Sequence, residues 1–107
     1  MACIMLQYDI PTDPDKLREY SYWVANDAMP SISKALGLKE MRAYRNFGKG
    51  SPEITVMIEF GQLNHAMSFL ATETWNNLLT TCPSFGVSSL LVNLLVDSPL
   101  VPEPLKP

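Results

Sequence analysis

Two segments near the ends of the chain, residues 2–10 and 87–96, are apolar at most positions. Successive side chains of a strand point to opposite faces of a sheet, so each segment is apolar on both faces. A strand of this kind is stable only where both faces are buried. A chain of 107 residues forms one domain that buries about 60–65% of its unfolded surface. We therefore expect that a partner helps to cover these strands.

Turn residues and helical periodicity organise the segment that follows the first strand. Residues 12–14, Thr-Asp-Pro, are typical of a helix start, and apolar residues then recur at helical spacing as far as Ala28. Pro30 is expected to end or kink this helix, because it has no N–H and crowds the preceding turn. Gly37 is expected to stop a short continuation in the left-handed conformation.

The second half of the chain has a hairpin followed by a helix. Residues 40–47 and 53–60 are predicted strands, joined by a loop rich in turn residues. A helix is expected over residues 62–71, with a new helical start at Thr72. The strand over residues 87–96 then completes the order strand, helix, strand, strand, helix, strand.

This order is that of the ferredoxin-like βαββαβ unit, an α+β fold with a four-stranded antiparallel sheet and two helices on one face. If about six apolar side chains on the other face stayed exposed to water, the chain would lose about 9–18 kcal/mol of burial free energy, which exceeds the stability of a typical domain. The same face of a second subunit is the simplest cover, so we expect a homodimeric α+β barrel. The domain spans residues 1–96, and residues 97–107 form a proline-rich C-terminal arm.

Composition and charge exclude several kinds of partner. The net charge is −3 and the basic residues are scattered, so no nucleic-acid surface is expected. No apolar run approaches the roughly 20 residues of a membrane helix, and the N-terminus lacks a signal-peptide pattern, which predicts a cytoplasmic protein with no membrane partner. Cys3 and Cys82 are expected as free thiols, and neither a metal nor a cofactor is predicted from the motifs present.

The order of elements over residues 2–96 resembles the dimeric α+β barrel superfamily. Within it, short motifs are similar to the EthD-type pattern: Tyr22-Trp23, then Ala28 and Pro30, then Leu36-Gly37-Leu38 and Tyr44. The turn over residues 71–75 is similar to the break in the second helix of relatives of the antibiotic-biosynthesis monooxygenases. Asp27 stands where the EthD-type pattern usually has a histidine, and Phe69 and Trp75 stand where related cyclases have a tyrosine and a histidine.

The resemblance implies a ligand cavity between the helices and the sheet. Trp23 and Trp75 would flank it, either as core anchors or as a stacking wall for a flat aromatic ligand. Asp27 and His65 are the candidate catalytic bases. Asp27 is equally well explained as a polar residue near a helix end, and a histidine placed like His65 is more often a surface or capping residue. Further candidates for substrate binding are Asn26, Arg42, Tyr44, Glu59 and Phe69. Arg42 and Glu59 are also expected to form a cross-strand ion pair.

Two functions are consistent with these residues. One is a cofactor-free enzyme that carries out cyclisation, proton transfer or oxygenation on a hydrophobic or aromatic intermediate, which the resemblance places in secondary-metabolite or pigment biosynthesis. The other is a non-catalytic protein that binds or carries a hydrophobic metabolite. The absence of the family histidines favours the carrier, and the sequence leaves open whether the protein is an enzyme.

Overall fold

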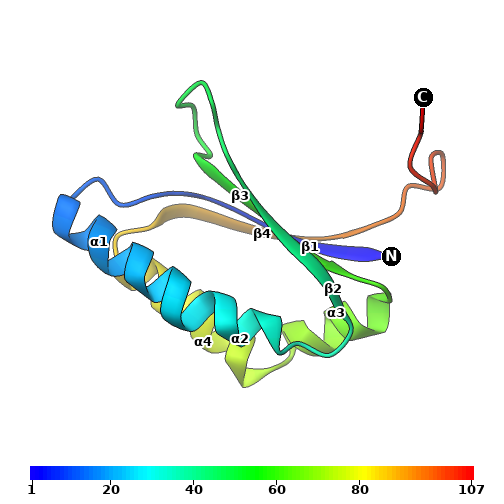
Figure 1. Cartoon of the computed structure of the whole chain (residues 1–107), viewed down its shortest axis with the longest axis horizontal. Helices are drawn as coiled ribbons and strands as arrows, with labels where there is room; N and C mark the ends of the chain where they lie inside the picture. Colours follow the sequence, from blue (N-terminus) through cyan, green and yellow to red (C-terminus); the bar gives the residue numbers. More distant parts are fainter.

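The computed structural model describes the whole chain, residues 1–107. In chain order the elements are β1 (Ala2–Asp9), α1 (Pro14–Trp23), the π-helical turn η1 (Val24–Ala28), α2 (Met29–Ser33), β2 (Leu38–Arg45), β3 (Ile54–Phe60), α3 (Leu63–Leu70), α4 (Glu73–Ser84) and β4 (Ser88–Val96). The strands form one antiparallel sheet in the order β2-β3-β1-β4. All helices lie on the same face of this sheet, which confirms the predicted ferredoxin-like α+β fold (Figure 1).

The first helical segment continues past Pro30 instead of ending there. Asp13 caps α1 by accepting a hydrogen bond from the N–H of Lys16 at 3.0 Å. In η1 the N–H of Met29 donates to the carbonyl of Val24, so the bond spans five residues rather than four. The extra residue interrupts the regular hydrogen-bond ladder next to Pro30, which has no N–H to donate. The predicted break is therefore a π-helical turn within one continuous helical segment.

The register of the hairpin differs from the prediction. Arg42 lies opposite Met57, and Glu59 lies opposite Glu40. Arg42 donates to Glu40 at 3.1 Å instead of pairing with Glu59, so the predicted Arg42–Glu59 ion pair is wrong. An irregularity between Leu38 and Glu40 changes the register. A slip of two residues leaves every side chain on its own face, so the alternation of polar and apolar residues did not reveal it.

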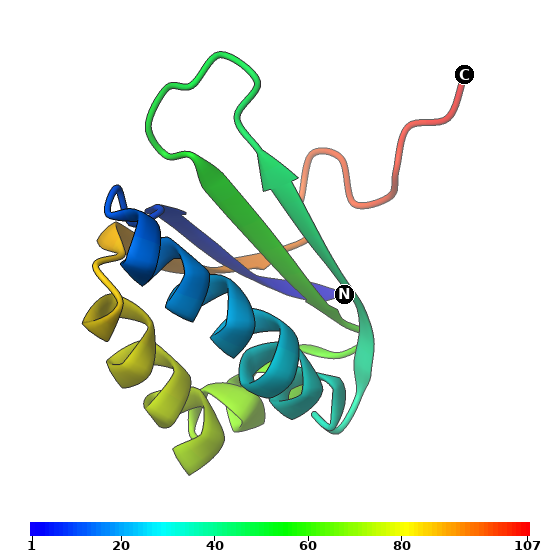
Figure 2. The ribbon, with the colours of Figure 1, turned by 60° about the vertical axis from the view of Figure 1, so that its left-hand side comes forward.

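The core lies between the sheet and the helices. Ile4 and Ile58 from the sheet are fully buried there, together with Phe60. The rings of Phe60 and Phe69 lie 5.8 Å apart, and Phe69 lies 5.6 Å from Trp75, so aromatic contacts connect β3 to α3 and α4. In Figure 2, α1 and α4 run side by side along this face of the sheet. The helices thus supply cover for one face of the strands.

The other face of the sheet has no cover within the chain. Cys3 on β1 pairs with Leu95 on β4, and both alternate with the buried Ile4 and its neighbours, so they point away from the helices. Leu91 and Leu95 are 54% and 39% exposed on this open face. Residues 97–107 form no helix or strand, and all of them are exposed. They extend away from the sheet beyond β4 (Figures 1 and 2).

Gly37 has the predicted left-handed conformation, but α2 already ends at Ser33 with Lys34 as its C-cap, so Gly37 lies in the turn before β2, where it makes room for His65. Its φ is +80°, in the left-handed region that favours glycine. A Cβ added to Gly37 would lie 2.1 Å from Nδ1 of His65 and 2.8 Å from its Cβ. The connection between α2 and β2 and the helix α3 therefore approach each other at a point where no larger residue fits.

We expect Gly37→Ala to lower the free energy of unfolding by about 1–3 kcal/mol, because the left-handed backbone and the contact with His65 both penalise a side chain. Urea denaturation measures this change. Gly61→Ala is the matched control, since a Cβ there meets nothing within 4 Å. The double variant Gly37→Ala/His65→Ala removes the imidazole ring of His65 but keeps the strain of the left-handed backbone at residue 37, so it separates the two contributions. Equal stabilities of the Gly37 and Gly61 variants would contradict this account.

Candidate functional site

An apolar cavity of about 280 Å³ lies between the helices and the covered face of the sheet. Side chains from β1, β2, β3 and β4 form its floor, and side chains from α1, η1, α2 and α4 form its roof. No charged side chain lines the cavity, and the only polar atoms of its side chains are those of Tyr8, Tyr20, Cys82 and the tryptophan indoles. Met29 and Ala43 line the cavity where α2 passes the edge strand β2. Both residues are exposed, so the cavity is close to solvent on this side.

Trp23 and Trp75 both form part of the cavity wall. Trp23 packs against Phe85, with ring centroids 5.5 Å apart. Trp75 is 4% exposed, and its backbone N–H donates to the side chain of Thr72, which caps α4. Phe69 does not line the cavity and instead supports the ring of Trp75 from the side of α3. The cap at Thr72 therefore fixes the position of one aromatic wall of the cavity.

A pair of tyrosines connects the floor of the cavity to its roof. The hydroxyl of Tyr8 on β1 lies 2.5 Å from the hydroxyl of Tyr20 on α1, and the two rings meet edge to face. Burial raises the pKa of Tyr8 and of Tyr20, and it raises the pKa of the neighbouring Cys82 to about 11. All three groups are therefore neutral at physiological pH. The sequence places both tyrosines on inward faces, and nothing in it indicates that their hydroxyls meet.

Asp27 lies outside the part of the cavity wall that Trp23 and Leu78 form. It is exposed and lines a groove of about 190 Å³ between η1 and α4, together with polar residues of α4. Trp23 and Leu78 line both this groove and the apolar cavity. The two side chains therefore separate Asp27 from the cavity. Asn26, its neighbour, donates to the carbonyl of Tyr22 at 2.8 Å and is exposed.

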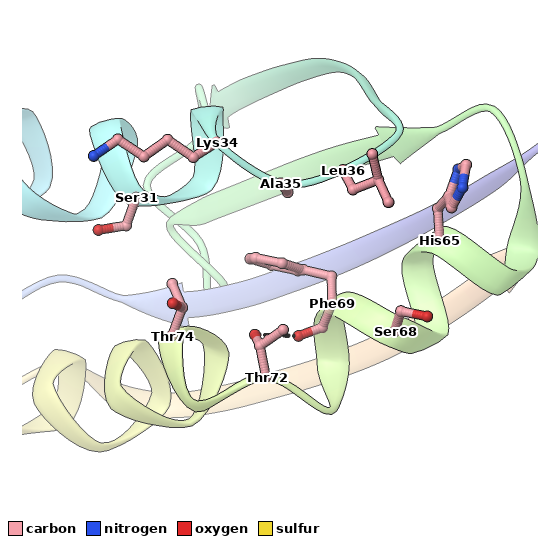
Figure 3. Close-up of a pocket in the computed structure, with 9 residues that line it drawn as sticks. All are labelled: Ser31, Lys34, Ala35, Leu36, His65, Ser68, Phe69, Thr72 and Thr74. Carbon is pink, nitrogen blue, oxygen red and sulfur yellow. Dashed lines mark hydrogen bonds between the residues drawn. The ribbon is translucent and has the colours of Figure 1, made fainter.

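His65 lies in a different pocket, of about 350 Å³, near the junction of α3 and α4. Figure 3 shows His65 and Phe69 projecting from α3 toward the segment that carries Ala35 and Leu36. Lys34 extends toward the opposite end of the pocket, away from the histidine (Figure 3). No residue lines both this pocket and the apolar cavity. Asp27 and His65, the two candidate bases, are thus brought neither to one site nor to the lining of the cavity.

The remaining candidates lie on the open face of the sheet. Arg42 and Glu59 alternate with residues of the covered face, and Arg42 is exposed. Tyr44, 52% exposed, lines a shallow hollow with Gln7 and Thr55. A hydrogen bond of 3.3 Å joins the last two side chains. Within one chain these candidates do not reach the apolar cavity, and their roles in binding stay predictions.

No group of three or more His, Cys, Asp or Glu side chains is placed to hold a metal ion. None of the helices is both long enough and apolar enough to cross a membrane.

The comparisons with known proteins agree on the fold. No protein-family model matches the chain, and no curated protein matches it in sequence. Among solved structures, a putative antibiotic biosynthesis monooxygenase from Deinococcus radiodurans superposes with a TM-score of 0.72 at 8% identity, over 92% of this chain and 93% of that one. SnoaB, a cofactor-independent oxygenase from Streptomyces nogalater, superposes with a TM-score of 0.70 at 14% identity, over 95% and 97% of the two chains.

A protein of the ethyl tert-butyl ether D (EthD) family from Bacillus halodurans has a TM-score of 0.68 at 16% identity, over 92% of this chain and 99% of its own. The chain thus has the fold of the EthD-like and antibiotic-biosynthesis-monooxygenase-like proteins. At these identities the likeness concerns the fold alone, and it confirms the predicted resemblance at that level.

The tyrosine pair makes a prediction about stability. Tyr8→Phe or Tyr20→Phe alone leaves one buried hydroxyl without its partner and is expected to lower the free energy of unfolding by about 1–3 kcal/mol. The double variant removes both hydroxyls and is expected to be nearly as stable as the unmodified chain. Urea denaturation of the four proteins gives the coupling energy of the pair. Additive effects of the two substitutions would contradict a shared hydrogen bond.

Proposed function

We propose that the protein binds a hydrophobic, aromatic small molecule in the apolar cavity between its helices and its sheet. The observation that carries this proposal is the cavity itself, because its lining has aromatic walls and no charged side chain. Small-molecule sites are typically concave and mostly apolar, with a few polar groups that orient the ligand. The volume of about 280 Å³ suits a molecule of two or three fused rings.

The proposal leaves room for two modes of action. In a cofactor-free enzyme, the cavity would strip water from an activated aromatic substrate and hold it in one orientation. One structural neighbour is named a cofactor-independent oxygenase and another a putative antibiotic biosynthesis monooxygenase. In a carrier, the cavity would only hold the molecule. One observation favours the carrier: the residues that line the cavity include no histidine and no carboxylate to act as a base. In either mode, secondary-metabolite or pigment biosynthesis is the proposed setting.

Binding is tested with tetralin, an uncharged two-ring hydrocarbon. We expect a saturable change in tryptophan fluorescence, because Trp23 and Trp75 form part of the wall. Ala43→Phe places a ring at the β2 side of the cavity and is expected to weaken binding about tenfold or more, through lost volume. Ala25→Phe is the matched control, since Ala25 is exposed and does not line the cavity. Equal binding by both variants would place the ligand elsewhere, and no binding to the unmodified chain would refute the proposal.

We propose further that a second copy of the chain covers the open face of the sheet, with residues 97–107 as an arm beside it. Leu91 and Leu95 support this proposal, because in a single chain these apolar side chains are exposed to solvent on the open face. A self-complementary face-to-face contact is the usual form of a twofold dimer. The tail is fully exposed, and its Leu100 and Leu105 side chains are about nine-tenths exposed. Both leucines could be buried beside this interface.

Sedimentation velocity tests the dimer. We expect the unmodified chain to sediment at twice the chain mass, and Leu95→Glu to shift it toward the monomer, since the substitution buries a carboxylate without a partner. Met67→Glu, on the outer surface of α3 and 55% exposed in the unmodified chain, is the control that should stay dimeric. A monomer in the unmodified protein, or an equal effect of both substitutions, would rule out this interface.

A further inference from the structure

We infer that the cavity selects an uncharged ring molecule that carries one hydrogen-bond acceptor, such as a cyclic ketone, and that the Tyr8–Tyr20 hydroxyl pair donates to this acceptor. The inference rests on the proposed binding function and specifies the chemical class of ligand. Four observations support it: the hydrogen-bond count of the pair, the chemistry of the lining, the protonation of the hydroxyls, and the position of the pair at one end of the cavity.

The hydrogen-bond count leaves one donor free. Each tyrosine hydroxyl has one hydrogen to donate and two lone pairs to accept. The bond of 2.5 Å between Tyr8 and Tyr20 uses one of the two hydrogens, and either oxygen can be its donor. It is the only hydrogen bond that either side chain makes within the chain. The second hydroxyl hydrogen therefore has no acceptor in the protein and is available to a molecule in the cavity whose wall both residues form.

The rest of the lining determines what that molecule can be. Besides the two tyrosines, only Trp23, Trp75 and Cys82 among the lining residues have a side-chain group that can donate a hydrogen bond, and the other side chains are hydrocarbons or thioethers. A carboxylate or an ammonium group placed there would lose its hydration with no opposite charge to pair with, which costs several kcal/mol. A hydrocarbon would fit but would leave the free hydroxyl hydrogen unpaired. A neutral acceptor satisfies both requirements.

The hydroxyls keep the protons that this role needs. Burial raises the pKa of Tyr8 and of Tyr20, so both stay protonated throughout the physiological range. The pair also lies at one end of the cavity, because Tyr8 is close to the end of β1 and pairs with Ile54 at the start of β3. An acceptor bound there would hold one end of the ligand, with the rings extending along the apolar lining toward Trp75.

The experiment compares 1-tetralone with tetralin, which lacks only the carbonyl oxygen. Isothermal titration calorimetry gives both affinities for the unmodified chain and for Tyr8→Phe/Tyr20→Phe. We expect the double variant to bind the ketone about three- to tenfold more weakly, the value of one neutral hydrogen bond, with no loss of affinity for tetralin. Tyr22→Phe is the matched control on the same helix, since Tyr22 is 69% exposed, and it should change neither affinity. The anion 2-naphthoate should not bind.

A second readout needs no variant. The infrared carbonyl stretch of bound 1-tetralone should lie below its frequency in hexane, as it does for a ketone that accepts a hydrogen bond. A stretch at the hexane frequency, or an unchanged ketone affinity in the double variant, would overturn the inference while leaving the proposed function intact if tetralin binds. Strong binding of 2-naphthoate would also overturn it. If neither ring molecule binds, the proposed function fails, and this inference fails with it.

Discussion

The structure depends on β1, a central strand of the sheet whose residues are largely apolar on both faces. Ile4 is fully buried under the helices, while Cys3 and Met5 on either side of it point to the open face and remain half-buried. A central strand with apolar residues on both faces needs a layer on each side. The chain supplies one layer with α1, α2, α3 and α4. The second layer is what a dimer of this fold would provide, and it accounts for the apolar side chains that the open face still carries.

The same arrangement produces the cavity. Large side chains such as Trp23 and Tyr20 line a roof that does not collapse fully onto the sheet, and the space that remains is bordered by apolar atoms. Such a space favours neutral, hydrophobic occupants, because any charge in it would lose its hydration. The lining contains no carboxylate and no imidazole, so in the proposed function recognition would depend on shape, on the aromatic wall and on the tyrosine hydroxyls.

The fold could be predicted because its signals are local: the strand alternation, the helix start before Pro14 and the left-handed turn at Gly37. The register of β2 could not, since the observed pairing differs from the predicted one by two residues, a difference that leaves every side chain on its own face. The site was only partly predictable. Helical spacing directed Tyr20 inward, but its hydrogen bond to Tyr8 depends on how α1 docks on the sheet. For the same reason the sequence did not reveal that Asp27 lies outside the wall formed by Trp23.

The central claim is that the apolar cavity holds a hydrophobic molecule within a dimer. Native mass spectrometry of the freshly purified protein tests this most directly, because it reports assembly and bound mass together. The account predicts a dimer that carries a discrete additional mass, or that gains one on incubation with 1-tetralone. A bare monomer that gains no mass under either condition would contradict it.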